Sequence, residues 1–128
     1  MYIINSPLRV LVTKKKLWTL NLGMYRNTNP FTLNNAKIQY GKDILNQLML
    51  LPQFDRITIE YVVYPKSLAL FDLDNVTSIH AKFFQDCLVG LGLIKDDNYK
   101  FIIGSSNRFG AVDKLNPRVE ILITEVKE

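Results

Sequence analysis

The chain has 128 residues, of which 48% are hydrophobic and 22% are charged. This length suits a single domain, residues 1–128, that buries roughly two-thirds of the surface of the unfolded chain, and a second domain is not expected. Sixteen Lys and Arg residues against twelve Asp and Glu residues give a net charge of +4, which favours a polyanionic partner.

Residue usage excludes several classes of protein and site. Cys87 is the only cysteine, so an internal disulfide bond is impossible and a reducing compartment is expected. No apolar run reaches the roughly 18 residues of a membrane span, and residues 1–4 lack the positive charge that begins a signal peptide. We therefore expect a cytoplasmic protein. The only histidine, His80, has no partner at zinc-ligand spacing and is expected to be a surface or packing residue.

The N-terminal part of the chain predicts two short strands. Residues 8–12 and 17–22 are apolar and flank the basic turn of residues 13–16, a pattern typical of a β-hairpin or of a strand with an extension. Residues 27–30 follow as a polar loop.

A helix and a strand are predicted next. Thr32 or Asn34 can cap the helix, whose apolar residues recur at helical spacing until Pro52 ends it. Residues 56–64 then alternate and are rich in Val, Ile, Thr and Tyr, which favours a β-strand.

The last part of the chain predicts a second helix and two strands. The helix begins near Asp74 or Asn75 and ends at Gly90 and Gly92. Its expected buried side consists of Val76, Ile79, Phe83, Phe84, Cys87, Leu88 and Leu91. Strands over residues 99–103 and 119–126 are joined by a long polar loop, residues 104–117, which is either a ligand-binding loop or a loose hairpin connection. The fold class is therefore α+β, with a mixed β-sheet packed against two main helices.

Acidic residues gather where the predicted strand leads into the second helix. Alternate residues of an extended segment point to the same side, so Asp72 and Asp74 can aim both carboxylates at one point. Asp96 or Asp97 can return to that point if the helix packs back along the sheet. Carboxylate oxygens suit Mg²⁺, so these residues form a candidate divalent-metal site. The alternative is that Asp74 or Asn75 only caps the helix.

The stretches around these acids occur in an order found in a known family. They are Asp72-Leu73-Asp74-Asn75, Gly90-Leu91-Gly92-Leu93-Ile94, Asp96-Asp97 and the alternating residues 119–126. In these stretches the chain resembles RusA-type Holliday junction resolvases, well over residues 57–126 and more loosely over residues 25–40. The resemblance implies a RusA-like fold and a small homodimeric endonuclease of phages and prophages. It also implies that Asp72, Asp74 and Asp97 bind Mg²⁺, which Mn²⁺ can replace, with Asp96 as a neighbour.

Two departures from the family concern the cations. The family has a lysine four residues after the second aspartate, where this chain has Ser78. Lys82 is one helical turn further on, displaced by about 40° around the axis and about 6 Å along it, and we hypothesise that it acts as the catalytic cation. Residues 66–71, which precede Asp72, contain one lysine where relatives are often basic. We therefore expect the DNA contacts at Lys14, Lys15, Lys16, Arg26, Arg108 and Lys114.

The expected reaction is paired hydrolysis of phosphodiesters in a four-way junction or other branched DNA, in recombination and repair. Metal ions bridged by carboxylates neutralise the charge that develops on the attacking and leaving oxygens. A homodimer suits two symmetric strands. Two alternatives remain. One is a branched-DNA-binding protein of the same fold with weak or no cleavage, favoured by Ser78 in place of the family lysine. The other is a small α+β interaction domain whose acidic residues only cap a helix and keep the surface solvated.

Overall fold

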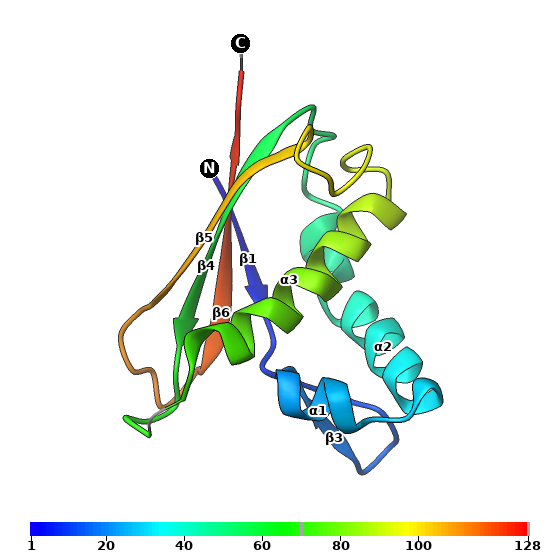
Figure 1. Ribbon diagram of the computed structural model, residues 1–128, viewed down its shortest axis with the longest axis vertical. Helices are drawn as coiled ribbons and strands as arrows, with labels where there is room; N and C mark the ends of the chain where they lie inside the picture. The colour runs from blue at the N-terminus through cyan, green and yellow to red at the C-terminus, as the bar shows by residue number, and fades with distance from the viewer. Residues whose placement is uncertain (70, 128) are drawn as a thin grey trace.

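In the computed structural model, which describes residues 1–69 and 71–127, a four-stranded sheet forms one layer and three helices lie on one of its faces (Figure 1). The strand order is β1-β6-β4-β5, with bounds Tyr2–Ser6, Arg118–Glu125, Ile57–Tyr64 and Ile102–Phe109. Strand β4 is parallel to β5 and antiparallel to β6, and β1 is antiparallel to β6. The mixed sheet confirms the predicted α+β class.

The predicted N-terminal hairpin is present. Strands β2 (Arg9–Leu11) and β3 (Leu17–Thr19) pair in antiparallel fashion, with Val10 opposite Trp18. Both of these side chains are buried, which fixes the hairpin to the core. Strand β1 was not predicted. Its inward residues are Ile4 and Ser6, and a serine at an inward position conceals the apolar alternation of a strand.

Two helices precede β4, where the sequence predicted one. Helix α1 (Leu22–Asn27) begins at Asn21, whose side chain accepts a 2.8 Å hydrogen bond from the Met24 amide. Helix α2 (Pro30–Leu48) is capped by Asn29, not by Thr32 or Asn34 as predicted. Proline suits the first helical position because the amide hydrogen that it lacks would have no partner inside the helix there. The inward residues of α2 recur every fourth position: Ala36, Tyr40, Ile44 and Leu48.

Helix α3 (Leu73–Gly90) also begins slightly earlier than predicted, because its N-cap is Asp72. It ends at the expected glycines. Gly92 has a φ of 70°, and the amide of Leu93 bonds the carbonyl of Leu88 at 2.9 Å, which closes a Schellman motif. Leu91 follows the last helical residue and is 50% exposed, which corrects its predicted place in the core. Thr77 and His80 are buried on α3 instead.

The region predicted as strand 99–103 and loop 104–117 is arranged differently. Strand β5 extends to Phe109 and pairs with β4, so only residues 110–117 connect it to β6, past the end of β4. The prediction of a loose hairpin connection was therefore wrong, and Arg108 lies in a strand. Its Nε donates a 3.2 Å hydrogen bond to Oε1 of Glu60 on β4.

The core lies between the sheet and the helices. Strand β4 points Ile57, Ile59, Tyr61 and Val63 into it, and β6 points Val119, Ile121 and Ile123 into it. On the helical side, Trp18 stacks on Phe83 of α3 at 5.5 Å. This packing fixes α3 along the sheet, so that its first turn lies near the end of β4 (Figure 1). No helix within residues 1–69 or 71–127 is long and apolar enough to cross a membrane.

Candidate functional site

Asp72 and Asp74 lie at the N-terminal end of α3. The backbone of Asp72 is extended, with φ −76° and ψ 129°, and its side chain makes no capping hydrogen bond within the described chain. Asp74 lies in the first turn, and both residues are exposed. Negative charge near a helix N-terminus is favourable, but capping leaves the Asp72 carboxylate unused. The prediction that Asp74 or Asn75 caps this helix was wrong.

Asn107 of β5 holds the Asp74 carboxylate. Its side-chain amide donates hydrogen bonds of 3.2 Å to Oδ1 of Asp74 and 3.0 Å to Oγ1 of Thr77. One amide therefore joins the edge strand of the sheet to the first turns of α3. Asn107 was not predicted as a site residue, because a polar residue in a stretch of weak strand propensity gives no sign of a partner so distant in the chain.

Asn75 connects the same turn to α1. Its Oδ1 accepts a 2.9 Å hydrogen bond from the Leu22 amide, where α1 begins. The three polar residues of the Asp-Leu-Asp-Asn segment therefore have three different environments. Asp74 and Asn75 are fixed by neighbouring elements, and the Asp72 carboxylate is left available to a ligand.

Asp97, Lys82 and Ser78 lie along a second feature, a groove of about 290 Å³. Its lining residues come from α1, α2, α3 and the segment after α3: Tyr25, Lys37, Ser78, Ala81, Lys82, Gln85, Asp86 and Asp97. The Nζ atom of Lys82 lies 5.6 Å from the centre of the Tyr25 ring. Ser78 Oγ is buried without a hydrogen-bond partner in the described part of the protein. The groove therefore brings together the predicted cation, the residue at the family lysine position and one predicted ligand.

The three predicted metal ligands are not gathered within one chain. Among residues 1–69 and 71–127, no group of three or more His, Cys, Asp or Glu side chains is placed to hold a metal ion. Asp72 and Asp74 lie at the start of α3, whereas Asp97 follows the helix in the chain and lines the groove with Ser78 and Lys82. Asp72 and Asp74 do not point to the same side as predicted for an extended segment, because Asp74 lies in a helix, where residues two apart do not face each other.

The donor chemistry nevertheless fits Mg²⁺, because Asp72, Asp74 and Asp97 all offer carboxylate oxygens. Asp96 has a local role. Its two carboxylate oxygens accept hydrogen bonds from the Asp97 amide at 2.7 Å and the Asn98 side chain at 3.1 Å. Asp96 thus shapes the turn, and the Asp97 side chain lines the groove.

All six predicted DNA-contacting residues are exposed. Lys14, Lys15 and Lys16 form the turn of the β2–β3 hairpin, Arg26 lies in the last turn of α1, and Lys114 lies between β5 and β6. The hairpin, the start of α3 and the segment between β5 and β6 all lie at the lower end of the molecule in Figure 1. Arg108 differs, because its guanidinium forms an ion pair with Glu60 of β4.

A polar network occupies the core behind α3. The Ser6 hydroxyl lies 2.6 Å from the Tyr40 hydroxyl and 2.6 Å from Nδ1 of His80. Burial lowers the pKa of His80 to about 3. Its Nε2 has no hydrogen-bond partner in the part of the chain that the structure describes. The histidine therefore stays neutral and packs in the core, which is the second of the two roles predicted for it, a surface residue or a packing residue.

No protein-family model matches the chain, and a search of curated proteins finds no relative.

Proposed function

We propose that this protein is a Mg²⁺-dependent endonuclease that cuts branched DNA, with four-way junctions as its substrate and paired hydrolysis of phosphodiesters as its reaction. The observation that carries the proposal is the environment of Asp72 and Asp74. Both residues are exposed at the start of α3, and side-chain capping of α3 uses neither carboxylate. The resemblance to RusA-type resolvases supports the same conclusion, together with a role in DNA recombination and repair in a bacterial or phage-infected cytoplasm.

Different residues of the chain have different roles in the proposed reaction. Mg²⁺, or Mn²⁺ in its place, neutralises developing charge and lowers the pKa of a bound water when it is present. Asn107 holds Oδ1 of the Asp74 carboxylate through a 3.2 Å hydrogen bond, which supports a positioning role for Asn107. Lys82 is the proposed cation for the phosphate, with the Tyr25 ring beside its ammonium group. Lys82→Ala should slow cleavage more than junction binding, and an unchanged cleavage rate would remove Lys82 from the mechanism.

DNA affinity in this proposal comes from the lower end of the molecule. Lys14, Lys15, Lys16, Arg26 and Lys114 are exposed there, on the same end as the start of α3. Contacts of Lys and Arg with phosphates release counterions, so junction binding should weaken steeply as salt is raised. Arg108 contributes less, because Glu60 already neutralises it.

The third carboxylate is supplied across a homodimer. Asp97 lines the groove beside Lys82, whereas Asp72 and Asp74 lie at the N-terminal end of α3. Two copies packed with antiparallel α3 helices around a two-fold axis would bring the groove of each copy toward the start of α3 in the other. Such a dimer presents two equivalent sites to the two equivalent strands of a junction.

Mixing inactive variants tests this arrangement. A dimer of one Asp74→Asn chain and one Asp97→Asn chain contains one intact site if each site is shared, because the remaining Asp74 and the remaining Asp97 then meet. Nicking should return when the two variants are mixed and refolded together. If the mixture stays as inactive as either variant alone, the three carboxylates do not meet across a dimer.

The substrate class is tested by comparing the cleavage of three kinds of DNA. A labelled four-way junction, a flap and a linear duplex of the same sequence are incubated with the protein in Mg²⁺, in Mn²⁺ and in EDTA. Paired nicks in the junction, dependent on metal, are expected. Tight junction binding without nicks in either metal would favour a branched-DNA-binding protein, and equal cutting of the linear duplex would remove the structure selectivity.

A further inference from the structure

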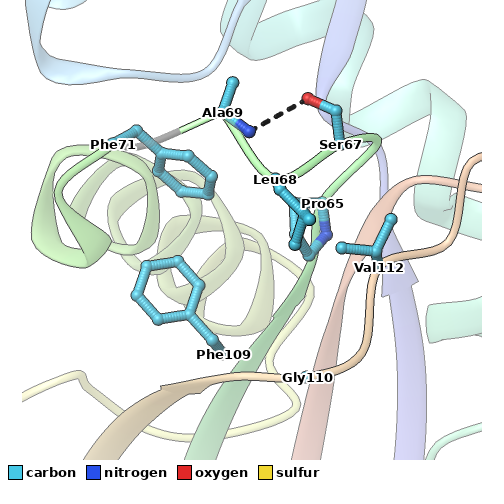
Figure 2. Close-up of a pocket in the computed structure, with 8 residues that line it drawn as sticks. All are labelled: Pro65, Ser67, Leu68, Ala69, Phe71, Phe109, Gly110 and Val112. Carbon is cyan, nitrogen blue, oxygen red and sulfur yellow. Dashed lines mark hydrogen bonds between the residues drawn. The ribbon is translucent and has the colours of Figure 1, made fainter.

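A cavity of about 250 Å³ lies beside the start of α3, between the segment that follows β4 and the segment that follows β5 (Figure 2). It is lined by Pro65, Ser67, Leu68, Ala69, Phe71, Phe109, Gly110 and Val112. Apart from Ser67, these residues present apolar side chains or backbone. Pockets for drug-sized ligands typically measure about 300–1,000 Å³, so this cavity suits a single flat ring system.

Two aromatic rings form one side of the cavity. Phe71 and Phe109 pack edge to face, with ring centroids 5.2 Å apart and an angle of 76° between the planes. Figure 2 shows both rings on one side and Val112 on the other, with Pro65 and Leu68 between them in this view. Aromatic side chains arranged in this way offer both a ring face and a ring edge to a planar ligand.

The backbone holds the two segments together. The Gly110 amide donates to the Val63 carbonyl at 2.7 Å, and the Asp113 amide donates to the Pro65 carbonyl at 2.8 Å. A Cβ atom at Gly110 would lie 2.6 Å from the Tyr64 ring, so a residue without a side chain is required where the segments meet. These contacts fix Pro65 and Gly110, two of the lining residues, relative to each other.

Its apolar rim faces solvent. Leu68 is 85% exposed, Phe109 is 47% exposed and Val112 is 43% exposed. Grouped exposed apolar side chains of this kind mark binding surfaces in otherwise polar protein surfaces. The cavity thus has the character of a ligand site.

The charges around the cavity indicate the ligand. Phe71 directly precedes Asp72, so one side of the cavity adjoins the proposed metal ligands. Lys66 lines an adjoining cavity of about 290 Å³ that shares Pro65, Ser67, Ala69 and Phe71 with the first. A nucleotide fits an apolar cavity that adjoins both a lysine and the proposed metal ligands, because its base can enter the cavity while its flanking phosphates lie near Lys66 and near the carboxylates that would hold the metal. An apolar peptide would make no use of the lysine.

We infer that this cavity holds one unstacked nucleobase of the DNA strand that the site at Asp72 and Asp74 cuts. This inference rests on the proposed nuclease function. Stacking of bases on aromatic side chains tolerates any sequence, since every base has a π face. Removing a base from the stack costs a few kcal/mol in a duplex and least where pairing is already disturbed. The cavity therefore favours branch points over continuous duplex, which links the site to structure selectivity.

The test uses junctions with 2-aminopurine at each position next to the branch, bound to the full-length protein in Ca²⁺. Wild type should raise the fluorescence several-fold at one position, because the probe leaves the base stack there. Phe109→Ala should reduce this rise and weaken junction binding by about five- to one-hundred-fold. Leu115→Ala is the matched control. Leu115 is 96% exposed in the same segment and does not line the cavity, so this variant should retain both signals.

A second variant fills the cavity instead of removing a wall. Val112→Trp should give the same losses as Phe109→Ala while thermal unfolding stays unchanged, which separates blockage from misfolding. Junction binding with unchanged fluorescence at every position, or a rise that survives both variants, would overturn this inference and leave the nuclease proposal standing. Failure of wild type to bind the junction would overturn both. Conversion of a dimer to a monomer by Phe109→Ala would assign the cavity to a second copy of the chain and also overturn it.

Discussion

The side-chain amide of Asn107 on β5 donates a 3.2 Å hydrogen bond to the carboxylate of Asp74 on α3. The same amide donates to Thr77, one turn further along the helix. This contact ties an exposed carboxylate to the edge of the sheet and gives it a defined orientation. Since a metal site requires fixed oxygen ligands, Asn107 is a positioning residue for Asp74 in the proposed enzyme.

Asn107→Ala should therefore raise the Mg²⁺ concentration needed for half-maximal cleavage several-fold, while the rate at saturating Mg²⁺ falls less. The cost in unfolding free energy should be modest, about 0.5–1.5 kcal/mol for the lost hydrogen bonds. A Mg²⁺ titration of the cleavage rate, with Asn46→Ala on the exposed side of α2 as control, measures this. An unaltered Mg²⁺ requirement would mean that the bond has only a structural role.

Asp72 and Asn29 are both N-cap residues, but only Asn29 uses its side chain as a cap. Asn29→Ala should cost about 1 kcal/mol of unfolding free energy. Asp72→Ala should change the unfolding free energy by less than about 0.5 kcal/mol and abolish metal-dependent cleavage. Urea denaturation of the two variants makes the comparison. A large loss of stability in Asp72→Ala would show that this residue is retained for the helix.

The buried His80 predicts an acid-sensitive fold. Its pKa is lowered to about 3 in the folded protein, against about 6.5 when unfolded, so the unfolded state binds the additional proton. The neutral His80 ring makes its full contribution to the unfolding free energy above about pH 6.5, and this contribution is lost as the pH falls toward about 3. Between pH 7 and pH 5 the loss should be about 2 kcal/mol.

Urea denaturation at the two pH values measures this loss, with His80→Gln as the control. The chain has no other histidine, so the variant should lose most of the slope in this range. A slope that is the same in both proteins would assign the acid sensitivity to carboxylates.

The hairpin turn at Lys14, Lys15 and Lys16 should contribute to junction affinity through phosphate contacts. Replacing all three by alanine should weaken binding to junction and duplex alike and reduce the slope of log affinity against log salt concentration by up to about 2.7. A matched triple replacement of Lys42, Lys100 and Lys127 removes the same charge elsewhere. Equal effects of the two triple variants would indicate that only net charge matters.

The fold was predictable where local patterns decide the structure. Alternation in β6 and helical spacing in α2 and α3 identify these elements, because one face of each is buried against the core. The predicted strand at residues 99–103 ended too early. The segment Gly104-Ser105-Ser106-Asn107 has weak strand propensity and becomes part of β5 through pairing with β4. Helix α1 has six residues and is held partly by Asn75, a residue far along the chain.

The candidate site was likewise predictable only where a local pattern in the sequence indicates it. The sequence places Asp72 and Asp74 at a strand-to-helix junction, and they lie there in the structure. Asn107 is 33 residues from Asp74 along the chain, so no local pattern connects them. The aromatic pair of Phe71 and Phe109 was missed for the same reason, because parallel pairing of β4 and β5 brings the ends of two separate segments together.

The most direct test of the proposed enzyme compares paired nicking of a four-way junction by wild type, Asp74→Asn and Asp55→Asn in Mg²⁺. Asn keeps the shape of the side chain but removes its charge, and Asp55 is an exposed aspartate in the segment before β4. Wild type and Asp55→Asn should nick the two symmetric strands of the junction at the same rate, and Asp74→Asn should bind the junction without nicking it. Equal nicking by all three proteins, or none by wild type, would contradict a metal-dependent nuclease site at Asp72 and Asp74.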